Sequence, residues 1–324
     1  MVSPGMPTHS YMNKYLKPDL IVVSFLVPLI FLIFSGCTQQ ETPKKVSLYK
    51  RAGDVTQTTE HLQPNTLWFG FDLRLGPKEE VRIYTPFLKY LERATGKRFR
   101  IKFTEKYEDT VDNLGKGVTH FASLGTLNYV IGADKYGIRY LVSGVNNEGD
   151  PRYHAVIFTA PDSDIKSVKD IRGKCFAFGS NMSTQGHLVP RKMLEDEGVS
   201  LEDLGNYMYT GTHINAAKAV LNGECDAGGI QDSLANRLVS EGKIKIIRIS
   251  GPYPSSVIAY NSAVDSKLIE TVKSALLAFE PAGAHKDTLP GWDKTEMPLG
   301  FSRIDEPELD RVMSLAREYR LVIE

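Results

Sequence analysis

The sequence predicts an α/β fold of two lobes, each a mainly parallel sheet flanked by helices, with two strands that cross between the lobes. Short β-type runs alternate with amphipathic helical patterns, which is typical of parallel sheets covered by helices. The alternation occurs twice in succession, and a C-terminal segment remains that can return to the first set of elements. With 324 residues, 42% of them hydrophobic, the chain is long enough for two ordinary domains with cores of their own.

The first set of elements is expected from residue 66 onward. Pro77 stands where a first helical turn begins, apolar residues follow at spacings of three and four, and Gly96 ends the pattern. Pro86 interrupts this pattern and predicts a kink or a later start of the helix. Strands of this set are expected at residues 67–71, 100–104, 121–124 and 138–143, and further helices at 108–114 and 127–136.

The second set repeats the alternation and is followed by two more helices. Its strands are expected at residues 154–160, 174–179, 207–211, 225–230 and 243–250, and its helices at 168–173, 186–197, 214–221 and 233–239. The last two helices are expected at 266–279 and 306–319, and the two crossovers at 154–160 and 252–260. The predicted lobes are therefore residues 66–155 together with 257–324, and residues 156–256.

The N-terminal residues predict export from the cytoplasm. Lys14 and Lys17 precede an uncharged apolar run of 15 residues, 20–34, which is shorter than the roughly 20 residues of a membrane-spanning helix. A Ser-Gly pair then leads to Cys37. The segment resembles a bacterial lipoprotein signal, which implies that residues 1–36 are removed and that Cys37 carries a lipid. A plain membrane anchor is the alternative.

The residues that follow this signal are polar and show no sustained apolar period. Residues 37–65 are therefore expected to form a tether between the lipid and the folded part of the chain. Either Met1 or Met12 can be the start of translation, since a start at Met12 would give a signal of more ordinary length.

Composition and charge exclude several classes of protein. The chain has 39 Lys and Arg and 39 Asp and Glu, whereas a nucleic-acid-binding protein normally shows a basic excess. Because a balanced charge gives no long-range steering, any recognition of an anion has to be local. The common nucleotide, dinucleotide and zinc motifs are absent from the sequence, so no cofactor and no metal is expected. Whether Cys175 and Cys225 form a disulfide stays open, since both fall near the starts of neighbouring strands.

Two junctions between a strand and a helix carry polar donors. Ser183 and Thr184 stand at the start of one predicted helix, and Thr212 and His213 at the start of another. The first amides of a helix have no partner within it and carry a partial positive charge, which favours an anion. Each junction by itself is also explained by ordinary capping. Two such junctions at one edge of a sheet point to an anion site there.

A wider set of residues gives these junctions a family context. Its features follow one another at consistent spacing from residue 68 to about 254, and they are Phe69-Gly70-Phe71, Pro86-Phe87-Leu88, Tyr107, Tyr153, Asp170-Ile171-Arg172-Gly173-Lys174, Ser183-Thr184, Leu188-Val189-Pro190, His213, Gly223-Glu224-Cys225-Asp226-Ala227 and Pro254-Ser255. In these features the chain resembles the periplasmic phosphonate-binding proteins of ABC importers, within the wider group of phosphate, phosphite and phosphonate receptors. The resemblance implies the two-lobed fold of type II periplasmic binding proteins.

The resemblance also implies a set of ligand-binding residues. The phosphorus oxyanion would be held by Ser183, Thr184, Gln185 and His213, with Tyr107 from the opposite lobe. Gln185 replaces the third serine of the family's Ser-Thr-Ser motif and would reshape the site.

Other positions concern the far end of the ligand. Relatives that bind an aminoalkyl phosphonate have carboxylates near the positions of Ser233 and Ser256, and their absence argues against 2-aminoethylphosphonate. Asp232 could substitute for one of them, and Ser256 itself could contact the ligand. Arg74 could reach the cleft, although a loop charge exposed to solvent is the favoured interpretation.

The expected function is that of a lipid-anchored solute-binding component of an ABC importer, in the periplasm or at the cell surface. Its expected partners are a small oxyanion, an ABC permease in the inner membrane and the membrane that holds the lipid on Cys37; it is expected to be a monomer and no enzyme. An extracytoplasmic sensor that signals to a membrane kinase or receptor would share the fold. A remote alternative is a serine hydrolase that uses Ser183, His213 and Asp226.

Overall fold

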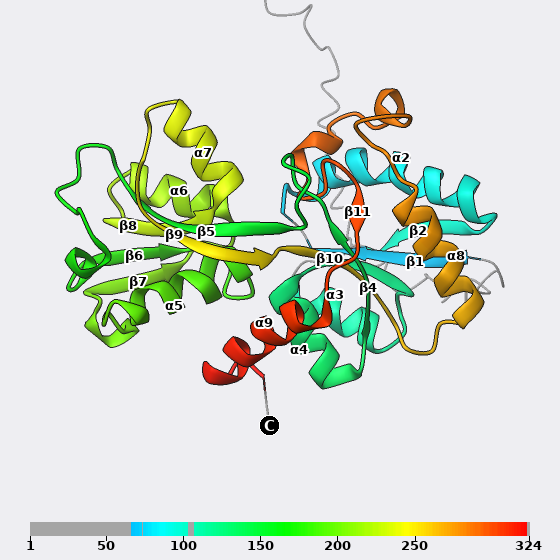
Figure 1. Cartoon of the computed structure of the whole chain (residues 1–324), viewed down its shortest axis with the longest axis horizontal. Helices are drawn as coiled ribbons and strands as arrows, with labels where there is room; N and C mark the ends of the chain where they lie inside the picture. The colour runs from blue at the N-terminus through cyan, green and yellow to red at the C-terminus, as the bar shows by residue number, and fades with distance from the viewer. Residues whose placement is uncertain (1–65, 73, 103–106, 323–324) are drawn as a thin grey trace, which may run out of the picture. The chain divides into compact units, whose positions relative to one another are not determined.

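The computed structural model describes residues 66–72, 74–102 and 107–322. The predicted signal segment, the tether and Cys37 lie outside these residues. Within them, no helix has both the length and the apolar composition needed to cross a membrane. The described chain forms two sheets with helices on both faces of each, and we call each sheet with its helices a lobe (Figure 1).

The first lobe is built on a six-stranded sheet with the order β11-β4-β10-β3-β1-β2. Its strands are β1 (Thr66–Phe71), β2 (Arg98–Lys102), β3 (Phe121–Gly125), β4 (Arg139–Gly144), β10 (Ser256–Tyr260) and β11 (Phe301–Ser302). Strand β1 pairs in parallel with β2 and β3, whereas β10 runs antiparallel to β3 and β4. The returning strands therefore make this sheet mixed.

Side chains that alternate along the strands fill two cores in the first lobe. Phe69 and Phe71 pack with the helices on one face, and Leu124 packs with those on the other face. The helices of the first face are α2 (Pro77–Thr95) and α8 (Ser266–Leu277), and those of the second are α3 (Tyr107–Gly115), α4 (Thr126–Tyr136) and α9 (Glu306–Glu318). Helix α2 continues through Pro86 without a late start.

The second lobe is built on a five-stranded sheet with the order β7-β6-β8-β5-β9. Its strands are β5 (Arg152–Thr159), β6 (Cys175–Phe178), β7 (Asn206–Tyr209), β8 (Ala227–Gln231) and β9 (Lys245–Pro254). Strand β6 is parallel to β7 and β8, and β5 is antiparallel to β8 and β9. The expected α/β architecture is present, with mixed sheets, since the strands that connect the lobes run against their neighbours.

Helices cover both faces of the second sheet. One face packs on α5 (Val189–Asp196), and the other on α6 (His213–Leu221) and α7 (Asp232–Ser240). Shorter turns complete the lobe and the C-terminal part: η1 (Val168–Ile171), η2 (Thr184–Leu188), η3 (Leu201–Asp203), η4 (Lys286–Thr288) and η5 (Trp292–Lys294). A disulfide joins Cys175 to Cys225, with their Cα atoms 4.6 Å apart.

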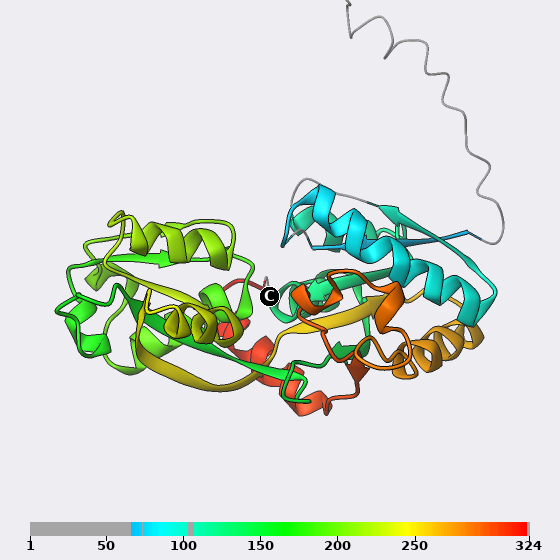
Figure 2. The same cartoon turned by 90° about the horizontal axis from the view of Figure 1, so that it is seen from above.

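Two chain segments and one helix connect the lobes (Figure 2). Strand β9 of the second sheet leads through the single residue Ser255 into β10 of the first sheet. Helix α9 packs on α4 and also reaches the second lobe, where the Arg311 guanidinium lies 3.9 Å from the ring centre of Tyr253. In the other direction, Arg191 of α5 lies 4.0 Å from the ring centre of Tyr319. These contacts place the C-terminal helix across the connection.

Candidate functional site

A cavity of about 760 Å³ lies between residues of the two lobes. The second lobe contributes the starts of η2 and α6 and the end of β8 to its lining. The first lobe contributes the segment after β1 and the segment between η5 and β11. The cavity therefore lies at the carboxyl ends of several strands, where open α/β sheets bind their ligands.

The turn η2 opens at the cavity with two oriented hydroxyl groups. Ser183 caps the turn, and its Oγ accepts a hydrogen bond of 2.9 Å from the amide of Gly186. The Oγ1 of Thr184 accepts one of 3.0 Å from the amide of Leu127 in the first lobe. A hydroxyl has one proton to donate besides its acceptor lone pairs. Both protons therefore stay available for a ligand while the oxygens are held in place.

The second junction lies directly beside the first. Thr212 caps α6 by accepting a hydrogen bond of 3.1 Å from the amide of Asn215. A β-carbon placed on Gly186 would meet Cε1 of His213 at 2.9 Å and Nδ1 at 3.1 Å, so this edge of the ring lies close to the glycine. Ser183, Thr184, Thr212 and His213 all line the cavity. The structure thus brings together the two helix starts that the sequence singled out.

His213 is neutral at neutral pH. Its burial lowers the pKa of the imidazole, the nearby Arg74 lowers it further, and Glu296 acts in the opposite direction. Its Nδ1 is buried and has no hydrogen-bond partner among the described residues. Nε2 is then the ring nitrogen that can meet a ligand, and with the proton on it His213 donates one hydrogen bond.

Gln185 lies at the cavity but is also bound to the connection between the lobes. Its amide nitrogen donates to the carbonyl oxygens of Tyr253 and Pro254, at 3.3 Å each. Both carbonyls belong to the end of β9. This side chain therefore couples the cavity to the segment that joins the two sheets.

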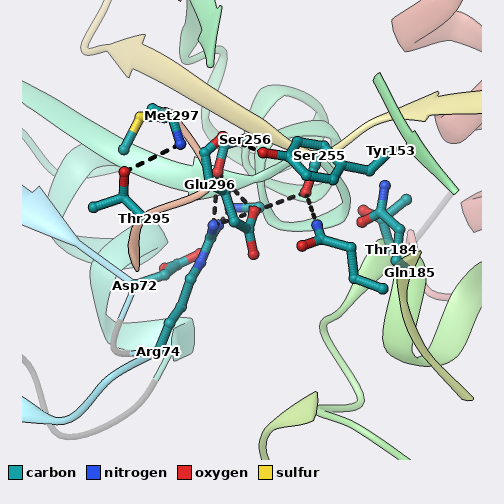
Figure 3. A network of polar contacts seen from close by, with 12 residues as sticks. Asp72, Arg74, Tyr153, Thr184, Gln185, Ser255, Ser256, Thr295, Glu296 and Met297 are labelled. Atoms are coloured by element: carbon teal, nitrogen blue, oxygen red, sulfur yellow. Dashed lines mark hydrogen bonds and ion pairs between the residues drawn. The ribbon is translucent and has the colours of Figure 1, made fainter. Parts of the chain in front are cut away.

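The first lobe presents an ion pair to the cavity (Figure 3). The guanidinium of Arg74 pairs with the carboxylate of Glu296 and donates a hydrogen bond of 2.6 Å to Ser256. Ser255 and Ser256 donate to the same Glu296 oxygen at 2.7 and 2.9 Å. Gln231 of the second lobe donates to Ser255 at 2.8 Å. Three side chains therefore bind Glu296 directly, and Gln231 of the second lobe is linked to it through Ser255.

The charge state of Glu296 follows from these contacts. Burial by itself would raise the pKa of Glu296, but the Arg74 guanidinium and the two serine hydroxyls help to outweigh burial, and the pKa lies below its usual range. The tyrosine of the connection, Tyr153, donates a hydrogen bond of 2.9 Å to the backbone carbonyl of Glu296. Glu296 is thus an ionised group with a fixed position.

Two further carboxyl groups are buried behind the ion pair. Oδ2 of Asp72 accepts hydrogen bonds from the amide of Gly125 and from Asn128, at 2.9 and 2.7 Å. Burial raises the pKa of Asp72 to about 6. Burial also raises the pKa of Glu80, whose Oε1 accepts from the amides of Arg74 and Leu75. One oxygen of each carboxyl group has no hydrogen-bond partner within the described residues.

The other predicted residues take different places. Arg74 lies in the cavity, so its interpretation as an exposed loop charge is wrong. Asp232 lines the cavity and accepts a hydrogen bond of 2.9 Å from the amide of His154, and burial raises its pKa. Ser256 lies within the ion-pair network. Tyr107 is the first residue of α3, and its side chain lies outside what the structure describes.

Sequence reasoning missed Glu296 and Asp72. Glu296 falls in a stretch interrupted by glycine and proline, 281–300, which offers no periodicity to place it. Asp72 directly follows β1, and a polar residue at the carboxyl end of a strand is a signal that could have found it.

The hydroxyl of Thr184 allows a test of the link between the lobes. Replacing Thr184 with Val removes the acceptor of the Leu127 amide and leaves a buried N–H group unpaired. We expect the free energy of unfolding to fall by about 1–3 kcal/mol. Urea unfolding followed by circular dichroism measures this change. Thr184→Ser keeps the hydroxyl and is the matched control; equal losses in the two variants would contradict the assigned bond.

Comparisons with known proteins agree with this geometry. A family model described as the periplasmic substrate-binding protein of phosphonate ABC transporters matches residues 69–306. The phosphate-import protein PhnD of Mycolicibacterium smegmatis is 30% identical over 207 residues, which are 59% of this chain and 64% of that protein. The match therefore spans slightly less than two thirds of that relative's length.

Solved structures share the fold. PhnD1 from Prochlorococcus marinus, solved in complex with methylphosphonate, has a TM-score of 0.70 and 16% identity, over 80% of this chain and 100% of that one. A binding protein component of an ABC phosphonate transporter from Pseudomonas aeruginosa has a TM-score of 0.67 and 19% identity, over 79% and 86% of the two chains. The fold class predicted from the sequence is confirmed.

Proposed function

This chain belongs to the family of periplasmic substrate-binding proteins of phosphonate ABC transporters, and we propose that it binds a small phosphorus oxyanion between its lobes and delivers it to an ABC permease in the inner membrane. The ligand is phosphate, phosphite or a simple phosphonate. The protein releases this ligand without changing it chemically.

The observation that carries the proposal is the convergence of oriented donors at two adjacent helix starts. Ser183, Thr184 and Thr212 each accept a backbone hydrogen bond, which fixes the oxygen and leaves the proton for a ligand. His213 adds one N–H from a neutral ring beside Gly186. An oxyanion with three oxygens on one phosphorus can accept from several such donors at once, and charge-assisted hydrogen bonds are the strong ones.

The opposite wall completes the cavity from the first lobe. Its guanidinium, that of Arg74, is paired with the carboxylate of Glu296. The donors of the second lobe are therefore the groups that hold the oxyanion. Closure of the lobes requires that the ligand bind the closed state more tightly than the open one.

The arrangement does not support hydrolysis by Ser183. Asp226 accepts a hydrogen bond of 2.8 Å from the amide of Cys175 at the start of β6. Within the described residues, nothing orients the Nδ1 of His213, and the oxygen of Ser183 is committed to capping η2. A serine nucleophile needs a base held against it and a third group that orients the base.

The proposed cellular location of the protein rests on the sequence of residues 1–65. We propose that cleavage before Cys37 and lipidation of this residue anchor a monomer in the periplasm or at the cell surface, with residues 37–65 as the tether. Metabolic labelling with a palmitate analogue tests this: label on the wild-type chain and none on Cys37→Ser is the expected result.

A ligand panel tests the binding function. Phosphate, phosphite, methylphosphonate, 2-aminoethylphosphonate, sulfate and molybdate are titrated into the protein by calorimetry and compared by thermal shift. We expect one phosphorus oxyanion to bind best and to stabilise the fold by about 2.7 kcal/mol at a hundred times its Kd. If no phosphorus compound binds while a sugar or an amine does, the proposed function is wrong even though the fold stands.

A further inference from the structure

We propose that Arg74 sets the specificity of the cavity by occupying, as a cation fixed to the protein, the position beside Glu296 that the ammonium group of a ligand would otherwise take. The inference rests on the proposed function and narrows its substrate class to oxyanions without a positive charge at their far end. The proposed role belongs to the Arg74 side chain alone. The oxyanion of the ligand still binds to the residues of the second lobe.

The first step is the binding capacity of Glu296. Its carboxylate is ionised, mostly buried and held by Ser255, Ser256 and the Arg74 guanidinium. An ammonium group donates up to three hydrogen bonds, and the carboxylate and serine oxygens can accept them. Without Arg74, these groups would form a negatively charged site on the cavity wall.

The second step is the charge balance of this wall. Besides two tyrosines, the ionisable side chains that line the cavity are the acids Asp72, Glu80, Glu148, Asp232, Asp293 and Glu296, the bases Arg74, Arg237 and Lys294, and His213. Burial raises the pKa of three of these acids, Asp72, Glu80 and Asp232, which disfavours their charged forms. The surroundings of Glu296 instead stabilise its ionised form, and Arg74 forms an ion pair with it.

The third step is the electrostatic repulsion between Arg74 and a positively charged ligand. An ammonium group that approached Glu296 would also approach the Arg74 guanidinium, and two cations at such short range repel each other. A methyl or hydroxyl group in the same place meets no such repulsion. The cavity therefore discriminates against cationic ligands through the charge of Arg74. A repulsive group of this kind is one way in which proteins reject a close analogue of their ligand.

The test exchanges the charge on both sides of the ion pair. Affinities for methylphosphonate and 2-aminoethylphosphonate are measured by calorimetry for the wild type, Arg74→Gln, Arg74→Lys and the double variant Arg74→Gln/Glu296→Gln. In Arg74→Gln we expect the affinity for 2-aminoethylphosphonate to rise at least about tenfold. Arg74→Lys keeps a cation and should show no rise, and the double variant should lose the gain because Glu296 is no longer charged.

The outcomes separate this inference from the proposed function. Binding of methylphosphonate by the wild type without any gain of the amine in Arg74→Gln overturns the role of Arg74 and leaves the function intact. Equal weakening of both ligands would show that Arg74 serves the oxyanion, and it also overturns the inference. Binding of neither ligand by any variant overturns the inference, whereas the proposed function is decided by the full panel that includes phosphate and phosphite. A gain in Arg74→Gln supports the inference whatever the wild type binds.

A second variant decides the matter if Arg74→Gln does not fold. Glu296→Gln leaves the Arg74 guanidinium without this carboxylate, so the same position should now favour a negative group. We expect phosphonoacetate, which carries a carboxylate, to gain at least about tenfold over methylphosphonate relative to the wild type. An unchanged ratio overturns the inference.

Discussion

Replacing His213 with Ala is expected to weaken the binding of the preferred oxyanion about ten- to a hundredfold, which corresponds to the loss of one hydrogen bond to a charged group. His213 lines the cavity and its Nδ1 is buried beside Gly186, so we expect Nε2 to be the nitrogen that meets the ligand. Calorimetric titration of wild type and variant with the same ligand measures the loss. Since burial lowers the pKa of this imidazole, the loss should be similar at pH 7 and pH 8.

A matched variant separates binding from folding. His213→Gln keeps an N–H donor of similar reach and should recover part of the affinity, while circular dichroism melts should show both variants folded. Unchanged affinity in a folded His213→Ala would contradict the role of this residue at the oxyanion.

Replacing Asp72 with Asn is expected to change how stability depends on pH. The pKa of Asp72 is raised from 3.8 to about 6, first of all by burial. Between these values the folded state keeps a proton that the unfolded state has lost, so stability falls as the pH rises from about 4 to about 6. At pH 7.5 the full cost is present, about 3 kcal/mol. Asparagine avoids this cost, so Asp72→Asn should be more stable than the wild type at pH 7.5 and nearly equal to it at pH 4.

Urea unfolding at pH 4.5, 6 and 7.5 measures this difference. The side-chain oxygen of an asparagine can accept from the amide of Gly125 as the carboxylate does. Asp162→Asn on the exposed surface is the control and should leave the pH dependence as it is. If the free energy of unfolding of Asp72→Asn changes with pH as much as that of the wild type, the carboxyl group of Asp72 does not cause the pH dependence.

The residues of the second lobe could be predicted because their signals are local. A strand, a short polar loop and a helix start place Ser183, Thr184 and His213 at one edge of a sheet, and the spacing alone indicates this. Arg74 and Glu296 could not be paired in this way, since they lie in segments without periodicity that meet only in the folded chain.

The directions of the crossing strands could not be predicted from the sequence pattern of each strand. The predicted crossover at 154–160 corresponds to β5, whereas the one at 252–260 is divided at Ser255 between the end of β9 and β10. The sequence pattern of a strand does not depend on the direction of its neighbour. Their antiparallel pairing follows from the return of the chain between the two sheets, a property of the whole topology.

Ser255 is the single residue between β9 of one sheet and β10 of the other, and it is also part of the network that holds Glu296. A ligand group that alters the charge around this carboxylate would therefore act on a residue of the connection between the lobes. We expect natural variants that bind a new ligand at this wall to differ also in the balance between open and closed lobes.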